Sequence, residues 1–330
     1  MIAASLIVRN EATEILDCLD SLADLDLIVV VDTGSEDETR ELVAAWTRRR
    51  PDGPRVVQGG FRWIDDFAAA RNFAANLAAT EGAQWILTMS ADGRMAPGSI
   101  ACLREHLARL HGDPCRTVAI TQRSQRGGWE HRRVLVHRPG VRWVGAIHEN
   151  LAEDSGETAA DVVMVYGWSV SHHRDPNRNL RILLREAQQS PTARTCYYLG
   201  AEYMDQRRPA EAEPWFRRCI EASHWRAEKA DAWLYLAKIA WHDQRGDEAR
   251  EAALKSLLLA PDCRETLELM AEMSWPAEAA IWHRYAAAAR NTGVIFARRP
   301  AASIDTTPPA DGPPPSATDR LVAPLAGGAA

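Results

Sequence analysis

The chain has 330 residues, of which 46% are hydrophobic and 25% are charged, and its formal net charge is -6 at pH 7. This length is enough for about two domains, and the composition is that of an ordinary globular protein. The acidic balance argues against a nucleic-acid partner, and no apolar run reaches the ~20 residues that a transmembrane segment needs. The six cysteines show no metal-binding spacing, which favours a reduced, cytoplasmic setting.

In the first half of the chain, short apolar runs alternate with stretches that have helical periodicity. Ala12–Leu22 and Asp37–Trp46 carry apolar residues at helical spacing. Strand–helix alternation predicts a mostly parallel sheet covered by helices on both faces, which binds its ligand at the carboxyl edge of the strands. The predicted strands are Ala4–Val8, Leu27–Val31, Arg55–Val57, Trp85–Met89, Thr117–Thr121, Arg133–His137 and Val162–Tyr166.

Two of these predicted strands end in acidic turns. Leu27–Val31 is followed by Asp32-Thr33-Gly34-Ser35, and Trp85–Met89 is followed by Ser90-Ala91-Asp92. Because parallel strands end at one edge of a sheet, both aspartates are expected there, where they would bind a phosphate-bound metal or a nucleotide.

After residue 175 the strand pattern stops and helical patterns follow. Tyr198-Leu199-Gly200 aligns with Tyr235-Leu236-Ala237, 37 residues later. This predicts tetratricopeptide-like repeats, whose period is about 34 residues, although a plain helical bundle is the alternative. The expected domains are 1–175, 176–296 and a Pro/Ala/Gly-rich tail at 297–330, which is predicted to be disordered.

Several ordered motifs resemble those of family 2 glycosyltransferases, and more narrowly of the small bacterial and phage members that carry a tetratricopeptide tail. They are Ser5-Leu6-Ile7-Val8-Arg9-Asn10-Glu11, Val31-Asp32-Thr33-Gly34-Ser35-Glu36-Asp37-Glu38-Thr39 and Trp63-Ile64-Asp65-Asp66-Phe67-Ala68-Ala69-Ala70-Arg71-Asn72. The resemblance covers residues 1 to about 290. It implies an α/β GT-A domain, Rossmann-like, followed by the helical repeats, and a nucleotide-sugar donor, with a UDP-sugar expected.

The resemblance also implies roles in donor binding. Asp32 would contact the nucleotide base, Glu11 would lie near the nucleoside, and Asp66 and Arg71 would lie by the donor, where a guanidinium suits a diphosphate. Each residue also has a structural alternative. The Asp32 turn can cap the following helix through Ser35 or Asp37. Glu11 can serve as a helix N-terminal charge, and Arg71 can pair with Asp65 or Asp66 at the surface.

Ser90-Ala91-Asp92 departs from the family pattern, which is Asp-x-Asp. That motif binds a divalent cation, Mn²⁺ or Mg²⁺, which neutralises the leaving diphosphate. Asp92 remains as the expected metal ligand, and Ser90 takes a position that contacts the donor in related enzymes. The change weakens the expectation of metal binding and leaves altered donor choice or lost activity open.

A second group of candidates comes from Gly145-Ala146-Ile147-His148-Glu149, which resembles the segment that closes the acceptor side in this family. Glu149 is the expected catalytic base of an inverting transfer. His148 would orient Glu149 or bind the metal, and His172 is a further candidate metal ligand. Solvated loop or linker residues are the alternatives.

The sequence therefore favours an inverting, metal-assisted glycosyltransferase whose acceptor is a protein, a peptide or a glycan. A peptide acceptor is suggested by the repeats, since such stacks form concave binding surfaces. One alternative is a degenerate transferase domain that serves as a nucleotide-binding or peptide-binding scaffold. Another is a nucleotidyltransferase, because the same half-sheet serves both reactions.

Overall fold

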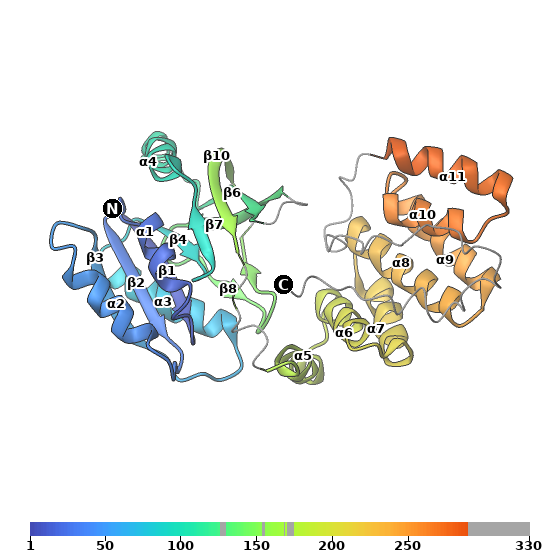
Figure 1. The fold of residues 1–330 in the computed structure, drawn as a ribbon, viewed down its shortest axis with the longest axis horizontal. Helices are drawn as coiled ribbons and strands as arrows, with labels where there is room; N and C mark the ends of the chain where they lie inside the picture. The colour runs from blue at the N-terminus through green and yellow to red at the C-terminus, as the bar shows by residue number, and fades with distance from the viewer. Residues whose placement is uncertain (126–129, 154–155, 168, 170–174, 290–330) are drawn as a thin grey trace. The chain divides into compact units, whose positions relative to one another are not determined.

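The computed structural model describes residues 1–125, 130–153, 156–167, 169 and 175–289, and it divides into two compact units, Met1–Arg178 and Asn179–Ala330. The first unit is α/β and the second is helical (Figure 1). The predicted disordered tail at 297–330 and the candidate His172 lie outside the described residues. None of the described helices has the length and apolar character needed to cross a bilayer.

An eight-stranded sheet forms the centre of the first unit, in the order β3-β2-β1-β4-β7-β6-β10-β5. The strands β1 to β4 pair in parallel, while β7 runs antiparallel to both β4 and β6, so the sheet is mixed. A separate two-stranded sheet joins β8 and β9. The strands are β1 Ile2–Val8, β2 Leu27–Asp32, β3 Arg55–Gly60, β4 Trp85–Met89, β5 Gly93–Met95, β6 Thr117–Ser124, β7 Glu130–His137, β8 Trp143–Val144, β9 Asn150–Leu151 and β10 Glu157–Tyr166.

Helices cover both faces of this sheet, as the alternation predicted. Along β2, Ile28 and Val30 enter the hydrophobic core that includes residues of α1, α2 and α4, whereas Leu27, Val29 and Val31 pack with the alanines of α3 in a second core. A strand buried on both faces has no polar alternation, which explains its continuous apolar run. The helices are α1 Ile15–Ser21, α2 Thr39–Arg48, α3 Phe67–Thr80 and α4 Ser99–Arg109.

The sequence interpretation missed several elements of this unit. The helix α4 and the short strands β5, β8 and β9 were not predicted, and β10 begins at Glu157 rather than Val162. Short strands leave too few residues for a period-2 pattern. The β10 pairing with β6 also contains a register shift between Ala159 and Val163, which interrupts the alternation.

The second unit consists of α5 and three helical hairpins, in which α6 packs on α7, α8 on α9 and α10 on α11. The first two hairpins repeat each other in detail. Arg207 and Gln244, 37 residues apart, both adopt a left-handed backbone, at φ +59° and +61°. The next residues, Arg208 and Arg245, each donate a main-chain hydrogen bond of 2.8 Å to the preceding helix. The helices are α5 Arg178–Gln189, α6 Ala193–Asp205, α7 Pro209–Ala222, α8 Arg226–His242, α9 Gly246–Leu259, α10 Arg264–Glu272 and α11 Pro276–Ala288.

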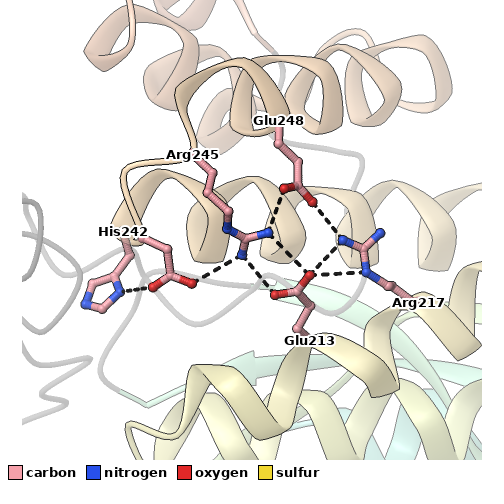
Figure 2. Close-up of polar contacts among 6 residues, drawn as sticks. Glu213, Arg217, His242, Arg245 and Glu248 are labelled. Atoms are coloured by element: carbon pink, nitrogen blue, oxygen red, sulfur yellow. Dashed lines mark hydrogen bonds and ion pairs between the residues drawn. The ribbon is translucent and has the colours of Figure 1, made fainter.

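An ion network joins the first hairpin to the second (Figure 2). The carboxylate of Glu213 on α7 pairs with Arg217 at 2.7 Å and with Arg245 at 2.9 Å, and both arginines also pair with Glu248 on α9. A stack of similar hairpins with contacts between neighbours is typical of helical repeat proteins. The assignment to the tetratricopeptide class stays a prediction.

Candidate functional site

Three of the predicted site segments follow strands that end at one edge of the sheet. In the parallel register, Val8 of β1 lies beside Asp32 of β2, and Leu6 lies beside Met89 at the end of β4. The chain therefore leaves these strands in the same direction, toward Glu11, the Asp32 turn and Asp92. This is the edge at which open α/β sheets bind ligands.

Asp32 lies in a tight turn beside a pocket. Its Oδ1 accepts hydrogen bonds from the main-chain N–H groups of Gly34, at 2.9 Å, and Ser35, at 3.0 Å, while its Oδ2 is buried with no hydrogen-bond partner. The helix-cap alternative holds for Asp37 and not for Ser35. The Asp37 carboxylate accepts from the N–H of Thr39, the first residue of α2, at 3.1 Å, whereas the Ser35 hydroxyl accepts from the main-chain N–H of Asn10. The pocket has a volume of about 280 Å³ and is lined by Val8, Val30, Asp32, Thr39, Arg40, Val43, Gln58, Gly59 and Gly60.

Glu11 connects the first strand to the end of the α/β unit. Its carboxylate accepts a hydrogen bond of 2.6 Å from the Ser169 hydroxyl, 158 residues later in the chain. Its main-chain carbonyl accepts from the N–H groups of Glu14 and Ile15 and so begins α1. The alternative in which Glu11 serves only as a charge at a helix N-terminus is therefore incomplete. Its main chain begins α1, but its carboxylate binds Ser169.

Asp66 caps α3. Its Oδ1 accepts from the main-chain N–H of Ala69 at 2.8 Å, which satisfies one of the free donors at the start of a helix. The structure therefore gives Asp66 a structural contact, while a contact with the donor stays a prediction.

Arg71 and Glu149, predicted separately for the donor and acceptor sides, form an ion pair with each other. Their side chains are only 13% and 8% exposed. The surface ion pair with Asp65 or Asp66 that was the alternative for Arg71 is replaced by this nearly buried contact. The guanidinium also lies 5.2 Å from the ring centre of Trp143. A charge pair with so little solvent is expensive to separate, because each partner would be left buried and uncompensated.

The segment that ends at Glu149 is held against α3 by main-chain contacts. The side-chain amide of Asn72 donates to the Trp143 carbonyl and accepts from the Trp143 N–H, both at 2.9 Å. The main-chain N–H of Phe67 donates to the Ala146 carbonyl at 2.8 Å. These hydrogen bonds join α3 to the segment before Glu149 at two points, and so bring together residues that are about 75 positions apart in sequence.

The charge of Glu149 is set by its arginine neighbours. Burial alone would raise the pKa of its carboxyl, but the positive charges of Arg71 and then Arg133 outweigh that effect and hold the pKa below its ordinary range. Glu149 is therefore ionised near neutral pH. An ionised carboxylate is able to accept a proton, as the base prediction requires.

Asp92 is 3% exposed, and its Oδ2 is buried without a hydrogen-bond partner. Burial raises the pKa of this carboxyl above its ordinary range. The Gly167 N–H donates to the Asp92 carbonyl at 2.8 Å, and a Cβ at position 167 would come within 2.6 Å of that oxygen. A glycine is thus required for the end of β10 to approach the Asp92 turn. Ser90 is half-buried, and its carbonyl accepts from the Gly93 N–H at 2.9 Å.

Backbone strain marks the same segments. In the described part of the first unit, the non-glycine residues with positive φ are Asn10 at +58°, Asp65 at +57° and His148 at +51°. Each one directly precedes a predicted site residue: Glu11, Asp66 or Glu149. Left-handed conformations cost free energy in residues with a side chain and are concentrated at functional sites.

While the metal-binding role of His148 stays a prediction, Asp92 fits a divalent cation. Its orphaned, buried carboxylate oxygen is a hard ligand of the kind that Mn²⁺ and Mg²⁺ prefer. Within the ranges that the structure describes, no group of three or more His, Cys, Asp or Glu side chains is placed to hold a metal. The described residues therefore do not form a complete metal site, and a cation bound at Asp92 would need further ligands such as water.

Two residues near this site were not predicted. Arg133 on β7 places Nη2 3.5 Å from the Glu149 carbonyl oxygen, and Tyr166 at the end of β10 pairs in register with Gly93, next to Asp92. Neither belongs to a short motif, and both come from strands that are distant in sequence from Asp92. No signal in the sequence indicated Arg133, because Arg132 and Arg133 are adjacent and identical in type, and only the face of the strand on which each lies distinguishes them.

Residues 5–160 match the family model described as "Glycosyl transferase family 2". The match lies wholly inside the first unit. A search of curated proteins found no match to this chain.

Among solved structures, the chain is similar to TarS residues 1–349 of S. aureus, with 12% identity, a TM-score of 0.41, and 79% of this chain and 89% of that chain covered. It is also similar to the mannosyltransferase PcManGT from Pyrobaculum calidifontis in complex with GDP-Man and Mn²⁺, with 17% identity, a TM-score of 0.44, and 88% and 86% covered. With TM-scores below 0.5, these structural similarities carry no functional argument, and the match to the family model is the one that supports a function.

Proposed function

We propose that this protein is an inverting glycosyltransferase that moves a sugar from a nucleotide-sugar to an acceptor. The observation that carries the proposal is that β1, β2 and β4 end at one edge of the sheet, where the Asp32 turn borders a pocket and the buried Asp92 follows β4. The charge of Arg71, which pairs with Glu149, also acts on Asp92. A nucleotide-sugar has a base, a diphosphate and a sugar in a row. The site offers the Asp32 pocket for the base, the Arg71 guanidinium for the diphosphate, and the buried Asp92 carboxylate for a cation bound to that diphosphate.

On this proposal, the nucleotide base occupies the Asp32 pocket. The free Oδ2 of Asp32 accepts an N–H of the base, while Oδ1 remains committed to the turn. Arg71 contacts the diphosphate through its planar fork. Asp92 would hold the divalent cation, which supplies positive charge to the leaving nucleoside diphosphate.

Transfer needs a base on the acceptor side. Glu149 takes the proton of the acceptor nucleophile as that atom bonds to the anomeric carbon, and the bond from that carbon to the diphosphate oxygen breaks with its electron pair leaving on the nucleotide. The anomeric configuration inverts because the attack comes from the face opposite to the leaving group. Glu149 has a lowered pKa while Arg71 contacts it, and it becomes a stronger base when Arg71 turns to the diphosphate.

The helical unit is proposed to bind the acceptor. Its repeated hairpins present an extended surface, which suits a peptide or protein, and the residues proposed for the donor all lie in the first unit. We propose a protein, peptide or glycan acceptor and a UDP-sugar donor as the first to be tested.

The test is hydrolysis and transfer with a panel of nucleotide-sugars, measured with and without Mn²⁺, for the wild type and Asp92→Ala. We expect one donor to be consumed with release of nucleoside diphosphate, and the variant to lose at least 100-fold in rate, in the range of losses for electrostatic stabilisation of a transition state. Wild-type turnover by the variant would remove Asp92 from the mechanism. Release of inorganic diphosphate would indicate a nucleotidyltransferase.

One observation favours the second candidate, a binding scaffold without transferase activity. Ser90 replaces the first metal-motif aspartate, and Arg71 is already neutralised by Glu149. Stabilisation of the folded protein by a nucleotide, without consumption of any donor in the panel, would support the scaffold instead.

A further inference from the structure

Glu149 is contacted by two arginines that come from different elements. Arg71 on α3 donates from Nε to the Glu149 carboxylate. Arg133 on β7 brings Nη2 to 3.5 Å from the main-chain carbonyl oxygen of Glu149. The side chains of Arg71 and Glu149 are nearly buried, so solvent screens the charges of this pair poorly.

The charge of each arginine extends beyond Glu149. The positive charge of Arg71 acts on Asp92, and the positive charges of Arg71 and Arg133 both act on the Tyr166 hydroxyl. Tyr166 pairs in register with Gly93, the residue after Asp92. Both arginines therefore lie close enough to the end of β10 for their charges to act on Tyr166, and both contact Glu149.

A diphosphate has the complementary shape and charge. It carries two phosphoryl groups, and an arginine fork binds the oxygens of one such group through paired, charge-assisted hydrogen bonds. Arginine stays charged at all relevant pH values. With Ser90 in place of an aspartate, the site also contains one carboxylate fewer to repel the phosphates or to hold a cation.

Resting on the proposed function, we propose that Arg133 is a second diphosphate-binding residue, which acts with Arg71 as a two-arginine clamp on the leaving group. The clamp binds the diphosphate directly and does not depend on a cation at Asp92. Arg133 is then a residue of the donor site that no sequence motif identifies.

The test compares each nucleoside with its diphosphate: uridine with UDP, and guanosine with GDP. Their dissociation constants are measured by calorimetry on the full chain in EDTA and again with Mn²⁺. The variants are Arg133→Gln, Arg133→Lys and the matched control Arg132→Gln. Arg132 is the exposed neighbour of Arg133 on the same strand and points to the other face of the sheet. Thermal unfolding of every variant is recorded, and Arg133→Lys keeps the charge if the glutamine variant folds poorly.

We expect wild type and Arg132→Gln to bind one diphosphate at least 10-fold more tightly than its nucleoside in EDTA. Arg133→Gln should lose about 10-fold or more of that difference, as removal of a charge-assisted contact predicts, with nucleoside affinity unchanged. Arg133→Lys should fall between them, since it keeps the charge and loses the fork.

Two results would overturn the clamp while leaving the proposed function intact: diphosphate affinity that is the same in Arg133→Gln and wild type, or a diphosphate preference that exists only with Mn²⁺. If the wild type binds none of the four compounds under either condition, the proposed function fails and the clamp fails with it.

Discussion

The side-chain amide of Asn72 and the main chain of Trp143 form a reciprocal pair of hydrogen bonds, each 2.9 Å long. Asn72 is the residue after Arg71, and Trp143 begins the segment that ends at Glu149. Both Asn72 and Trp143 are buried. This contact fixes the spacing between α3 and the Glu149 segment, and it thereby brings the two halves of the buried ion pair together.

Replacing Asn72 with alanine should weaken both folding and transfer. The Trp143 N–H and carbonyl would be left buried without partners, which costs about 1–3 kcal/mol for each group. Denaturant unfolding should therefore show a loss of about 2–6 kcal/mol for the two groups together, and kcat for transfer should fall more than nucleoside affinity. Asn76→Ala, at an exposed position of the same helix, is the control and should match the wild type. Equal stability of the two variants would contradict the structural role of this pair.

Ser90→Asp should lower the Mn²⁺ concentration that gives half-maximal donor hydrolysis. The new carboxylate would add a second hard oxygen ligand near Asp92. Ser90→Asn has nearly the same size without the charge and serves as the control. An unchanged or higher metal requirement in Ser90→Asp would mean that Ser90 instead fits a different donor.

Gly200→Ala should destabilise the helical unit. A Cβ at this position would lie 2.7 Å from two atoms of the Phe216 ring, and that ring is itself stacked on Tyr235 with centroids 4.6 Å apart. Overpacking of this kind typically costs about 1–3 kcal/mol. Gly246→Ala has open space around it and should be neutral or slightly stabilising. Similar melting temperatures for both variants would show that the ring moves aside without cost.

The network around Glu213 should make stability depend on pH (Figure 2). Burial raises the pKa of this carboxyl, but hydrogen bonds from Arg217 and Arg245 outweigh burial and lower the pKa below its ordinary range. A lowered folded-state pKa means that the stabilisation is present above the unfolded-state pKa and is lost as pH falls through the folded-state value.

Comparison with Glu213→Gln measures this effect. Wild type should be more stable than the variant at neutral pH, by about 1 kcal/mol because the network is partly exposed. The difference should shrink toward zero in acid, where Glu213 is protonated in both states. A difference that stays constant across the pH range would indicate that packing, and not charge, accounts for it.

A large part of the first unit could be predicted from local sequence. Runs such as Leu27–Val31 are apolar at every position because both faces of the strand are buried. The acidic turn that follows indicates that the strand ends at the ligand-binding edge of the sheet. The 37-residue spacing between Tyr198-Leu199-Gly200 and Tyr235-Leu236-Ala237 predicted matching hairpins, and the left-handed Arg207 and Gln244 lie at the same spacing. These signals are local, since each depends on residues within one element or one turn.

The relations within the candidate site were beyond sequence reasoning. Motifs placed Arg71 on the donor side and Glu149 on the acceptor side, and only the tertiary structure decided that they pair with each other. The same holds for Arg133, which is distinguished from Arg132 solely by the face of β7 on which it lies, and for Asp92, whose burial depends on the approach of Gly167. The physical reason is that hydrophobic periodicity and turn chemistry act over a few residues, whereas desolvation and ion pairing depend on distances between segments far apart in the chain.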